Sequence, residues 1–319
     1  MRVDRASTRA GAARFGLELD RLTYLGGEDG DVYEGVDAEG SYVFKVVPSD
    51  EDGLRRTQEK LDFARYLADC GVQVAEPLLS PQGTMIEVVR QGDVVVAATK
   101  TVKAPGRHPR TDEPGEWNPE LFAKWGKVIG EMHALAKDYQ GGASIMHWED
   151  EVASMMSWCR DAEVLPHWAL MRDHLSALPR DRESYGLIHN DLHPFNFMVD
   201  SGEIVIFDFD VCGHHWFMTD IGIALFHALW AGPAGKSQSR EAFAQQFLAA
   251  FRSGYEAENY LDDAWWQELP TFLAYRRLLL FTVFADSWGG TDAPAWQRDW
   301  WHAQRAGILT GEPIVELSV

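Results

Sequence analysis

The sequence predicts an α+β fold with two lobes, a small β-rich N-terminal lobe followed by a larger, mainly helical lobe. Two observations carry this prediction. The first third of the chain alternates short β-prone runs with turns rich in Gly and Asp, whereas later segments repeat apolar residues at helical spacing. We place the lobes at residues 1–103 and 104–319, because residues 103–119 are rich in Pro, Gly and charge, as a boundary loop is.

The small lobe is expected to contain strands, one main helix and two further strands. Residues 21–47 hold β-prone runs separated by a Gly/Asp-rich turn and by the hairpin turn DAEG. An amphipathic helix follows in 49–71, because Ser and Asp can cap its start, apolar residues recur at helical spacing, and a glycine ends it. Residues 84–102 form another hairpin around RQGD.

The second lobe is expected to be mainly helical. Its strongest helix lies at 119–139, where apolar side chains follow one face. Residues 151–180 are also typical of helix, and two short β-like runs, GLIHND and EIVIFDFD, come next. The later predicted helices lie near 219–231, 238–257, 262–286 and 293–306.

Composition narrows the class of protein. The 319 residues are 46% hydrophobic, enough for an extensive core, which excludes a disordered or fibrous chain. Lys and Arg number 29 against 49 Asp and Glu, and the net charge of −20 repels nucleic acid and anionic membranes while permitting a cationic small substrate. The three cysteines form no CxxC pair, and no apolar run is long enough for a signal or a membrane span, so we expect a cytoplasmic protein.

The most informative stretch is HNDLHPFNFMVDSGEIVIFDFD at residues 189–210. Asp191 follows a short apolar run, Asn196 comes five residues later after a proline, and a hairpin delivers Asp208 at the end of a second apolar run. Phosphoryl transfer from ATP needs a carboxylate to orient and deprotonate the attacking hydroxyl, and ligands for the magnesium that neutralises the phosphates. Asp, Asn and a strand-borne Asp at this spacing supply both functions.

On these residues the sequence resembles the aminoglycoside phosphotransferase and choline kinase superfamily. The resemblance rests on HNDLHPFN at 189–196 and on IVIFDFDVCGHHWFMTDIGIAL at 204–225, and it extends through the N-terminal lobe. KWGKVIGEMHAL and FLAYRRLLLF are most similar to a bacterial branch near type II homoserine kinase-like and stress-response kinase-like proteins. The resemblance implies a protein-kinase-like two-lobed fold and an ATP- and Mg²⁺-dependent transfer of the γ-phosphate to the hydroxyl of an aminoglycoside, amino alcohol or similar metabolite.

The resemblance also assigns roles to residues of the second lobe. It makes Asp191 the catalytic base or hydroxyl-orienting carboxylate, and Asn196 and Asp208 the magnesium ligands. His189 is then a structural member of the loop, and Asp220 is similar to a buried aspartate of the family that braces the loop through hydrogen bonds.

The N-terminal lobe should supply a phosphate-binding lysine, and YVFKVV places Lys45 in a hydrophobic strand where an ammonium group needs a charged partner. We select Glu59 of the following helix as that partner. Asp62 is the alternative, and Lys60 occupies one plausible alignment position.

Two further segments are expected to contact the nucleotide. The loop LGGEDGDVYEG at 25–35, with Gly26 and Gly27, would form the turn over the phosphates because of its place before the lysine strand. The chain around Lys100 to Val102 would be the hinge whose backbone meets adenine.

Other functions stay open at this point. A metal-dependent hydrolase would use the alternating acids and histidines of the same stretch and the residues just after it as ligands. That set is His189, Asp191, His193, Asp208, Asp210, His214 and His215.

In the kinase interpretation, Asp210 is either a supporting partner of the magnesium carboxylate or a solvated loop residue. A serine/threonine protein kinase of the stress-response type is the main alternative, although no Ala-Pro-Glu segment follows Asp208.

Overall fold

The computed structural model describes residues 3–27, 30–92, 94–233 and 236–317, and its mixed α and β composition confirms the predicted α+β class. Tertiary contacts divide the chain into two compact units. The first unit consists of Met1–Arg107, Tyr139–Ile145 and Phe197–Asp210, and the second of His108–Asp138, Met146–Asn196 and Val211–Val319. Two later segments thus group with the N-terminal third, so the stretch of residues 189–210 passes from the second unit to the first between residues 196 and 197.

The first unit is built on an antiparallel five-stranded sheet in the order β1-β2-β3-β5-β4. The strands are β1 (Thr23–Gly26), β2 (Asp31–Asp37), β3 (Gly40–Ser49), β4 (Ile86–Gln91) and β5 (Val94–Val102). Along β3, Phe44 and Val46 are fully buried in the core of one face, while Lys45 between them points to the other face because strand side chains alternate. The register places Lys45 opposite Val32 and Thr99.

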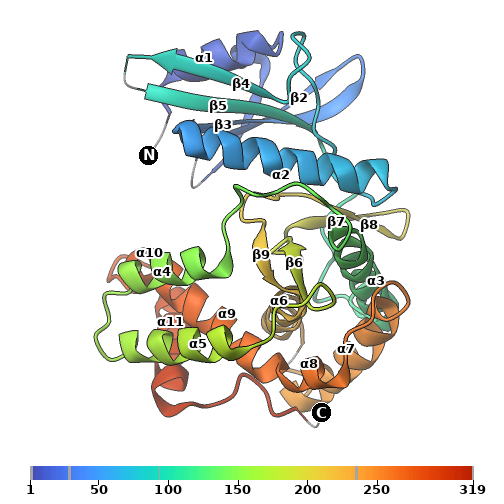
Figure 1. Ribbon diagram of the computed structural model, residues 1–319, viewed down its shortest axis with the longest axis vertical. Coiled ribbons are helices and arrows are strands. Elements are labelled where there is room, and N and C mark those ends of the chain that lie inside the picture. The colour runs from blue at the N-terminus through green and yellow to red at the C-terminus, as the bar shows by residue number, and fades with distance from the viewer. Residues whose placement is uncertain (1–2, 28–29, 93, 234–235, 318–319) are drawn as a thin grey trace. The chain divides into compact units, whose positions relative to one another are not determined.

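Helix α1 (Arg5–Arg14) covers the face of the sheet that carries Phe44 (Figure 1). It begins at the Asp4 cap, whose carboxylate accepts hydrogen bonds from the backbone nitrogens of Ala6 and Ser7 at 2.9 Å. The sequence analysis predicts no helix here. The reason is that its buried face consists of small residues such as Gly11 and Ala12, which give little hydrophobic periodicity.

Helix α2 (Glu51–Asp69) confirms the helix predicted in 49–71 and packs against β3. Asp50 caps it by accepting a hydrogen bond from the Gly53 nitrogen at 2.6 Å, and Phe63 and Leu67 bury its inner face. The hairpin of β7 (Phe197–Asp200) and β8 (Glu203–Ile206) belongs to the same unit, because the Ile206 backbone pairs with Gln73 and Ala75.

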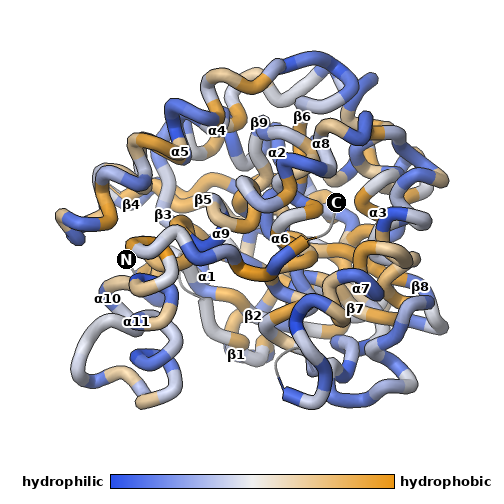
Figure 2. Tube along the Cα trace, turned by 90° about the horizontal axis from the view of Figure 1, so that it is seen from below, coloured by the Kyte–Doolittle hydropathy of each residue, from blue (hydrophilic) through white to orange (hydrophobic). Residues whose placement is uncertain are grey.

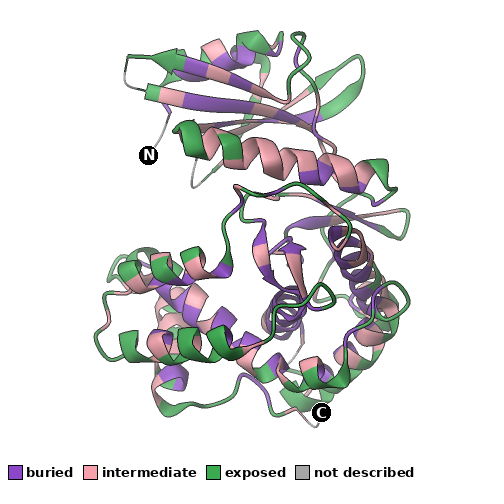
Figure 3. Cartoon of the chain, in the orientation of Figure 1, coloured by how far each residue is buried: buried purple, intermediate pink, exposed green. Residues whose placement is uncertain are grey.

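The second unit is mainly helical, as predicted, and contains one small pair of strands. Its helices are α3 (Pro119–Ala136), α4 (Trp148–Trp158), α5 (Leu165–Ala177), α6 (Phe217–Ala231), α7 (Arg240–Tyr255), α8 (Asp263–Gln267), α9 (Leu269–Val283), α10 (Ala285–Trp288) and α11 (Ala295–Thr310), and its strands are β6 (Tyr185–Ile188) and β9 (Gly213–Trp216). Residues 217–229 of α6 are all buried, so α6 is the central element of this unit (Figure 3). Hydrophilic and hydrophobic residues alternate along the peripheral helices (Figure 2).

The structure divides two of the predicted helices. The segment predicted as helix at 151–180 forms α4 and α5, because Asp161 accepts hydrogen bonds from the backbone nitrogens of Glu163 and Val164 in the turn between them. The segment at 262–286 is likewise divided, and Pro270 stands in the first turn of α9, where a proline costs no hydrogen bond. Within the described ranges, no helix is both long and apolar enough to cross a membrane.

Candidate active site

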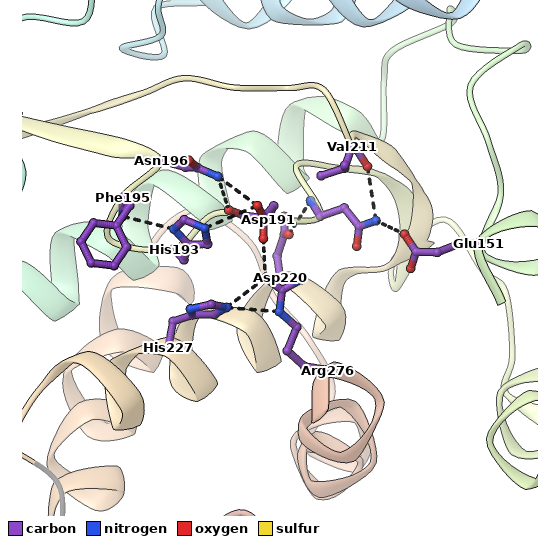
Figure 4. A network of polar contacts seen from close by, with 10 residues as sticks. Glu151, Asp191, His193, Phe195, Asn196, Val211, Asp220, His227 and Arg276 are labelled. Carbon is purple, nitrogen blue, oxygen red and sulfur yellow. Dashed lines mark hydrogen bonds and ion pairs between the residues drawn. The ribbon is translucent and has the colours of Figure 1, made fainter. Parts of the chain in front are cut away.

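The loop that carries Asp191 begins directly after β6 and is fastened to the start of α6 by Asp220 (Figure 4). One Asp220 carboxylate oxygen accepts the Asn190 backbone N–H at 2.8 Å, and the other accepts the His189 N–H at 3.1 Å. Asn190 adopts a left-handed φ of 64°, which turns the chain sharply just before Asp191. The position of the loop is therefore fixed by its backbone.

Asp220 is fully buried, and a buried carboxylate is tolerated only where donors surround it. A third donor is the Nε2 of His133 on α3, 3.2 Å from the carboxylate, while His133 Nδ1 lies 3.0 Å from the Tyr255 hydroxyl. Burial lowers the pKa of His133, so its ring is neutral, and Nε2–H donates to Asp220 while Nδ1 accepts from Tyr255. The brace thus links the loop to three helices.

Both carboxylate oxygens of Asp191 are held by donors (Figure 4). Oδ1 accepts a hydrogen bond from the guanidinium of Arg276 on α9. Oδ2 accepts from Asn196 Nδ2 at 3.1 Å and lies 3.5 Å from His193 Nε2. Burial raises the pKa of Asp191, but the Arg276 charge and the His193 ring lower it by more, so that the pKa lies well below its ordinary value. Asp191 is therefore a carboxylate at neutral pH.

Arg276 is itself fixed by His227 of α6. Arg276 is 5% exposed, and its Nε and Nη2 lie 3.2 Å and 2.9 Å from His227 Nε2. Burial and the Arg276 charge hold the pKa of His227 well below its ordinary value, so the neutral ring accepts these hydrogen bonds. The sequence analysis missed both residues. Their only local signal is a charged or polar residue within the apolar helical runs LAYRRLLLF and IALFHALW.

A second network joins the loop to α4 through Glu151. The Asn190 side-chain amide donates to the Glu151 carboxylate at 2.7 Å and to the Val211 carbonyl at 3.3 Å, and the Tyr275 hydroxyl donates to the same carboxylate. Burial raises the pKa of Glu151. The sequence analysis did not identify Glu151, because its partners lie far away in the sequence.

In the first unit, Lys45 forms an ion pair with the carboxylate of Asp210, which lies two residues beyond Asp208. Neither predicted partner takes this place. Glu59 accepts a hydrogen bond from the Ser144 backbone nitrogen at 2.6 Å, and Asp62 accepts one from Gln58 at 2.9 Å. The prediction that Glu59 pairs with Lys45 is therefore wrong for this structure, because Glu59 instead fastens the segment 139–145 to α2.

Two candidate metal ligands have oxygen atoms suited to a divalent ion. Asp208 is exposed, adopts a left-handed φ of 68°, and its carboxylate makes no hydrogen bond or ion pair with the described residues. Such a conformation in a residue other than glycine is characteristic of functional sites. Asn196 donates through Nδ2 to the carbonyl and carboxylate of Asp191, at 3.0 Å and 3.1 Å, which directs its amide oxygen elsewhere. Carboxylate and amide oxygens are ligands that Mg²⁺ prefers, so both residues fit that ion.

The glycine loop begins with two residues of positive φ. Gly26 and Gly27 have φ of 117° and 137°, and a Cβ atom at Gly27 would overlap the Gly30 carbonyl oxygen. Glu28 and Asp29 of this loop lie outside the described residues.

The predicted hinge is occupied by other protein groups. The Lys100 carbonyl accepts the Leu78 N–H at 2.8 Å, the Val102 N–H donates to the Glu76 carbonyl at 2.9 Å, and the Lys100 side chain lies 2.8 Å from Asp37. These two backbone groups are therefore engaged within the protein, and the adenine contact of this segment stays a prediction.

The geometry required by the hydrolase alternative is not found in the part of the chain that the structure describes. No group of three or more His, Cys, Asp or Glu side chains there is arranged to hold a metal ion. His214 stacks on His147 with ring centroids 4.4 Å apart, and His215 is 1% exposed, so neither ring is placed as a ligand.

Comparison with known proteins agrees with this chemistry. Residues 22–270 match the model of a family described as a phosphotransferase enzyme family. An amicoumacin kinase of Bacillus subtilis (strain 168) is 31% identical over 314 residues, which are 95% of this chain and 91% of that protein.

Solved structures give the same result. A structure of the amicoumacin kinase hAmiN in complex with AMP-PNP, Ca²⁺ and Ami matches with a TM-score of 0.89 and 30% identity, over 99% of this chain and 96% of that one. A microcompartment-associated aminopropanol kinase matches with a TM-score of 0.68 at 18% identity, over 96% and 95% of the two chains, and supports the fold alone. These matches confirm the predicted kinase-like fold.

Proposed function

The chain belongs to the phosphotransferase enzyme family and transfers phosphoryl groups to hydroxyls of small molecules, and from that premise we propose that it uses ATP and Mg²⁺ to phosphorylate a hydroxylated small molecule similar to amicoumacin. The acceptor is inferred from the amicoumacin kinase of B. subtilis, whose likeness extends over 95% of this chain. The nucleotide is inferred from the AMP-PNP in the structure of hAmiN.

The observation that carries the proposal is the state of Asp191. A carboxylate that remains ionised can accept a hydrogen bond from the acceptor hydroxyl and take its proton as the bond to phosphorus forms. Arg276 and His193 keep this carboxylate charged, and the Asp220 brace keeps it in place. Positioning of this kind is most of what the protein contributes to phosphoryl transfer.

The other residues have supporting roles in this proposal. Lys45 binds phosphate oxygens of the nucleotide, and the glycines at 26 and 27 let the backbone approach them. Asn196 and Asp208 would hold the divalent ion, which when bound neutralises charge on the phosphates. His189 contributes its backbone N–H to the brace.

The proposal is tested by an ATP-consumption screen of the purified protein. Acceptors should include amicoumacin, aminoglycosides, 1-amino-2-propanol, homoserine and a generic protein substrate, with GTP as a competing donor. We expect ATP turnover with amicoumacin and none with the protein substrate. Turnover with the protein alone would instead support the serine/threonine kinase alternative, and no turnover with any small acceptor would contradict the proposal.

A further inference from the structure

Five aromatic side chains of the second unit form one group of ring contacts between α6, α10 and α11. They are Trp230 of α6, Phe284 directly before α10, Trp288 of α10, and Trp296 and Trp300 of α11. Trp230 and Trp300 stack with ring centroids 5.0 Å apart, and Phe284 and Trp288 stack at 4.2 Å. We refer to these five residues as the ring cluster.

The ring cluster differs in exposure from the core of the same unit. Core tryptophans such as Trp125, Trp168 and Trp216 are 0% exposed. In the ring cluster, by contrast, Trp296 is 58% exposed and the other four side chains are half-buried. Aromatic side chains that gather at a surface leave apolar area in contact with water, and such a group is characteristic of a ligand-binding site.

A row of ring contacts joins the ring cluster to Asp191. The His193 Nε2 lies 3.5 Å from Asp191 Oδ2, and the His193 ring centroid is 4.7 Å from that of His227 (Figure 4). The His227 ring in turn lies 5.6 Å from the Trp230 ring. Two histidine rings therefore separate the carboxylate from Trp230, so a molecule whose hydroxyl lies at Asp191 can extend to the ring cluster.

The arrangement of the rings indicates the kind of group that they bind. In each stacked pair, one face of each ring is covered by its partner. Trp288 also packs edge-on against Trp230 and Trp300, at interplanar angles of 70° and 79°, which covers further ring faces. Ring edges carry partial positive charge, so they repel an ammonium group and attract the face of another aromatic ring. The ring cluster thus favours an aromatic ring over a cation.

We propose that the ring cluster binds an aromatic ring of the phosphate acceptor and that Trp230 is its first contact. The inference rests on the proposed function, because it names the class of acceptor for the same reaction. That class is a hydroxylated small molecule with an aromatic ring held at some distance from the reacting hydroxyl. Binding of the ring then places the hydroxyl at Asp191, which is the positioning that phosphoryl transfer requires.

The test compares three amino alcohols that differ in one group. 1-Amino-4-phenylbutan-2-ol adds a benzyl group to 1-amino-2-propanol, and 1-amino-4-cyclohexylbutan-2-ol has the saturated ring of the same size. Dissociation constants are measured by calorimetry with AMP-PNP and Mg²⁺ present, and ATP consumption is measured separately for each compound.

The same titrations are made with Trp230→Leu, Trp300→Leu and Trp230→Phe. The matched control is Trp158→Leu, because Trp158 at the end of α4 is 58% exposed, as Trp296 is, and lies outside the ring cluster. Thermal melting of each variant verifies folding, and the comparison of the three compounds on wild type needs no variant.

We expect wild type to bind the phenyl compound about tenfold or more tighter than 1-amino-2-propanol, the range for burial of a side chain of this size. It should also bind the phenyl compound about threefold or more tighter than the cyclohexyl compound, because ring pairs contribute beyond their buried area. Both leucine variants should lose most of this preference, Trp230→Phe should keep most of it, and Trp158→Leu should bind as wild type does.

Two results would overturn the inference. The first is equal affinity of wild type for the phenyl compound and either of the other two compounds. The second is a preference that stays unchanged in both leucine variants. Ring-dependent binding without phosphoryl transfer from ATP to any small acceptor would instead overturn the proposed function and leave the ring site in place.

Discussion

The Asp220 brace gives the most quantitative prediction, through the substitution Asp220→Asn. The side chain keeps its shape, but its amide group replaces one of the two oxygens that accept the His189 and Asn190 N–H groups. One buried backbone donor then faces another donor. An unsatisfied buried donor costs about 1–3 kcal/mol, so we expect the free energy of unfolding to fall by that amount.

The same substitution should affect catalysis more than stability. A displacement of a catalytic group by about 1 Å costs roughly a hundredfold in rate, and Asp191 directly follows the two braced residues. Urea unfolding, followed by fluorescence of the 13 tryptophans, measures the loss of stability, and kcat with saturating ATP measures the loss of catalytic rate. The control Asp286→Asn, at a side chain 76% exposed, should change neither. Unchanged stability and kcat in Asp220→Asn would refute the bracing role.

Three further predictions concern acid stability, helix packing and the nucleotide. Burial lowers the pKa of His215 to about 3, so the folded state stays neutral while the unfolded state takes up a proton below its ordinary pKa of 6.5. The free energy of unfolding therefore decreases as pH falls below 6.5, and His215 accounts for about 2 kcal/mol of that decrease between pH 7 and pH 5. Urea titrations at the two pH values should show a smaller decrease for His215→Phe. An equal decrease in the variant would contradict a neutral, buried His215 in the folded state. Gly126→Ala would place its methyl group against the Phe251 carbonyl, so α3 and α7 must separate, at a cost of about 1–3 kcal/mol in the free energy of unfolding. Urea unfolding measures this cost, and Gly115→Ala, whose added methyl group meets no other atom, is the control. Equal stability of the two variants would contradict the close contact at Gly126. Lys45→Met should weaken AMP-PNP binding by about tenfold or more, and retained affinity in calorimetry would exclude Lys45 from the phosphate site.

The features that could be predicted from sequence are those encoded locally. The structure contains the hairpin before Asp208 and the helix predicted in 49–71. Both could be predicted because they depend on neighbouring residues and on hydrophobic periodicity. The spacing from Asp191 to Asn196 is likewise a local feature of the sequence. Helix α1 escaped prediction because small residues form its buried face.

The partners of the site residues could not be predicted, because tertiary packing selects them. Arg276 reaches Asp191 from 85 positions away, and Lys45 reaches Asp210 from 165 positions away. A sequence pattern indicates that Lys45 needs an acid, but several acids on the following helix satisfy that requirement equally. Only the fold turns Glu59 toward Ser144 and leaves Asp210 beside the lysine.

The central claim is that Asp191 directs a small-molecule hydroxyl at the γ-phosphate of ATP. Mass spectrometry of a reaction containing the protein, ATP, Mg²⁺ and amicoumacin tests it most directly, with Asp191→Ala in parallel. We expect wild type to add one phosphoryl group to amicoumacin and Asp191→Ala to add none while still binding AMP-PNP. Full phosphorylation by Asp191→Ala would contradict the mechanism.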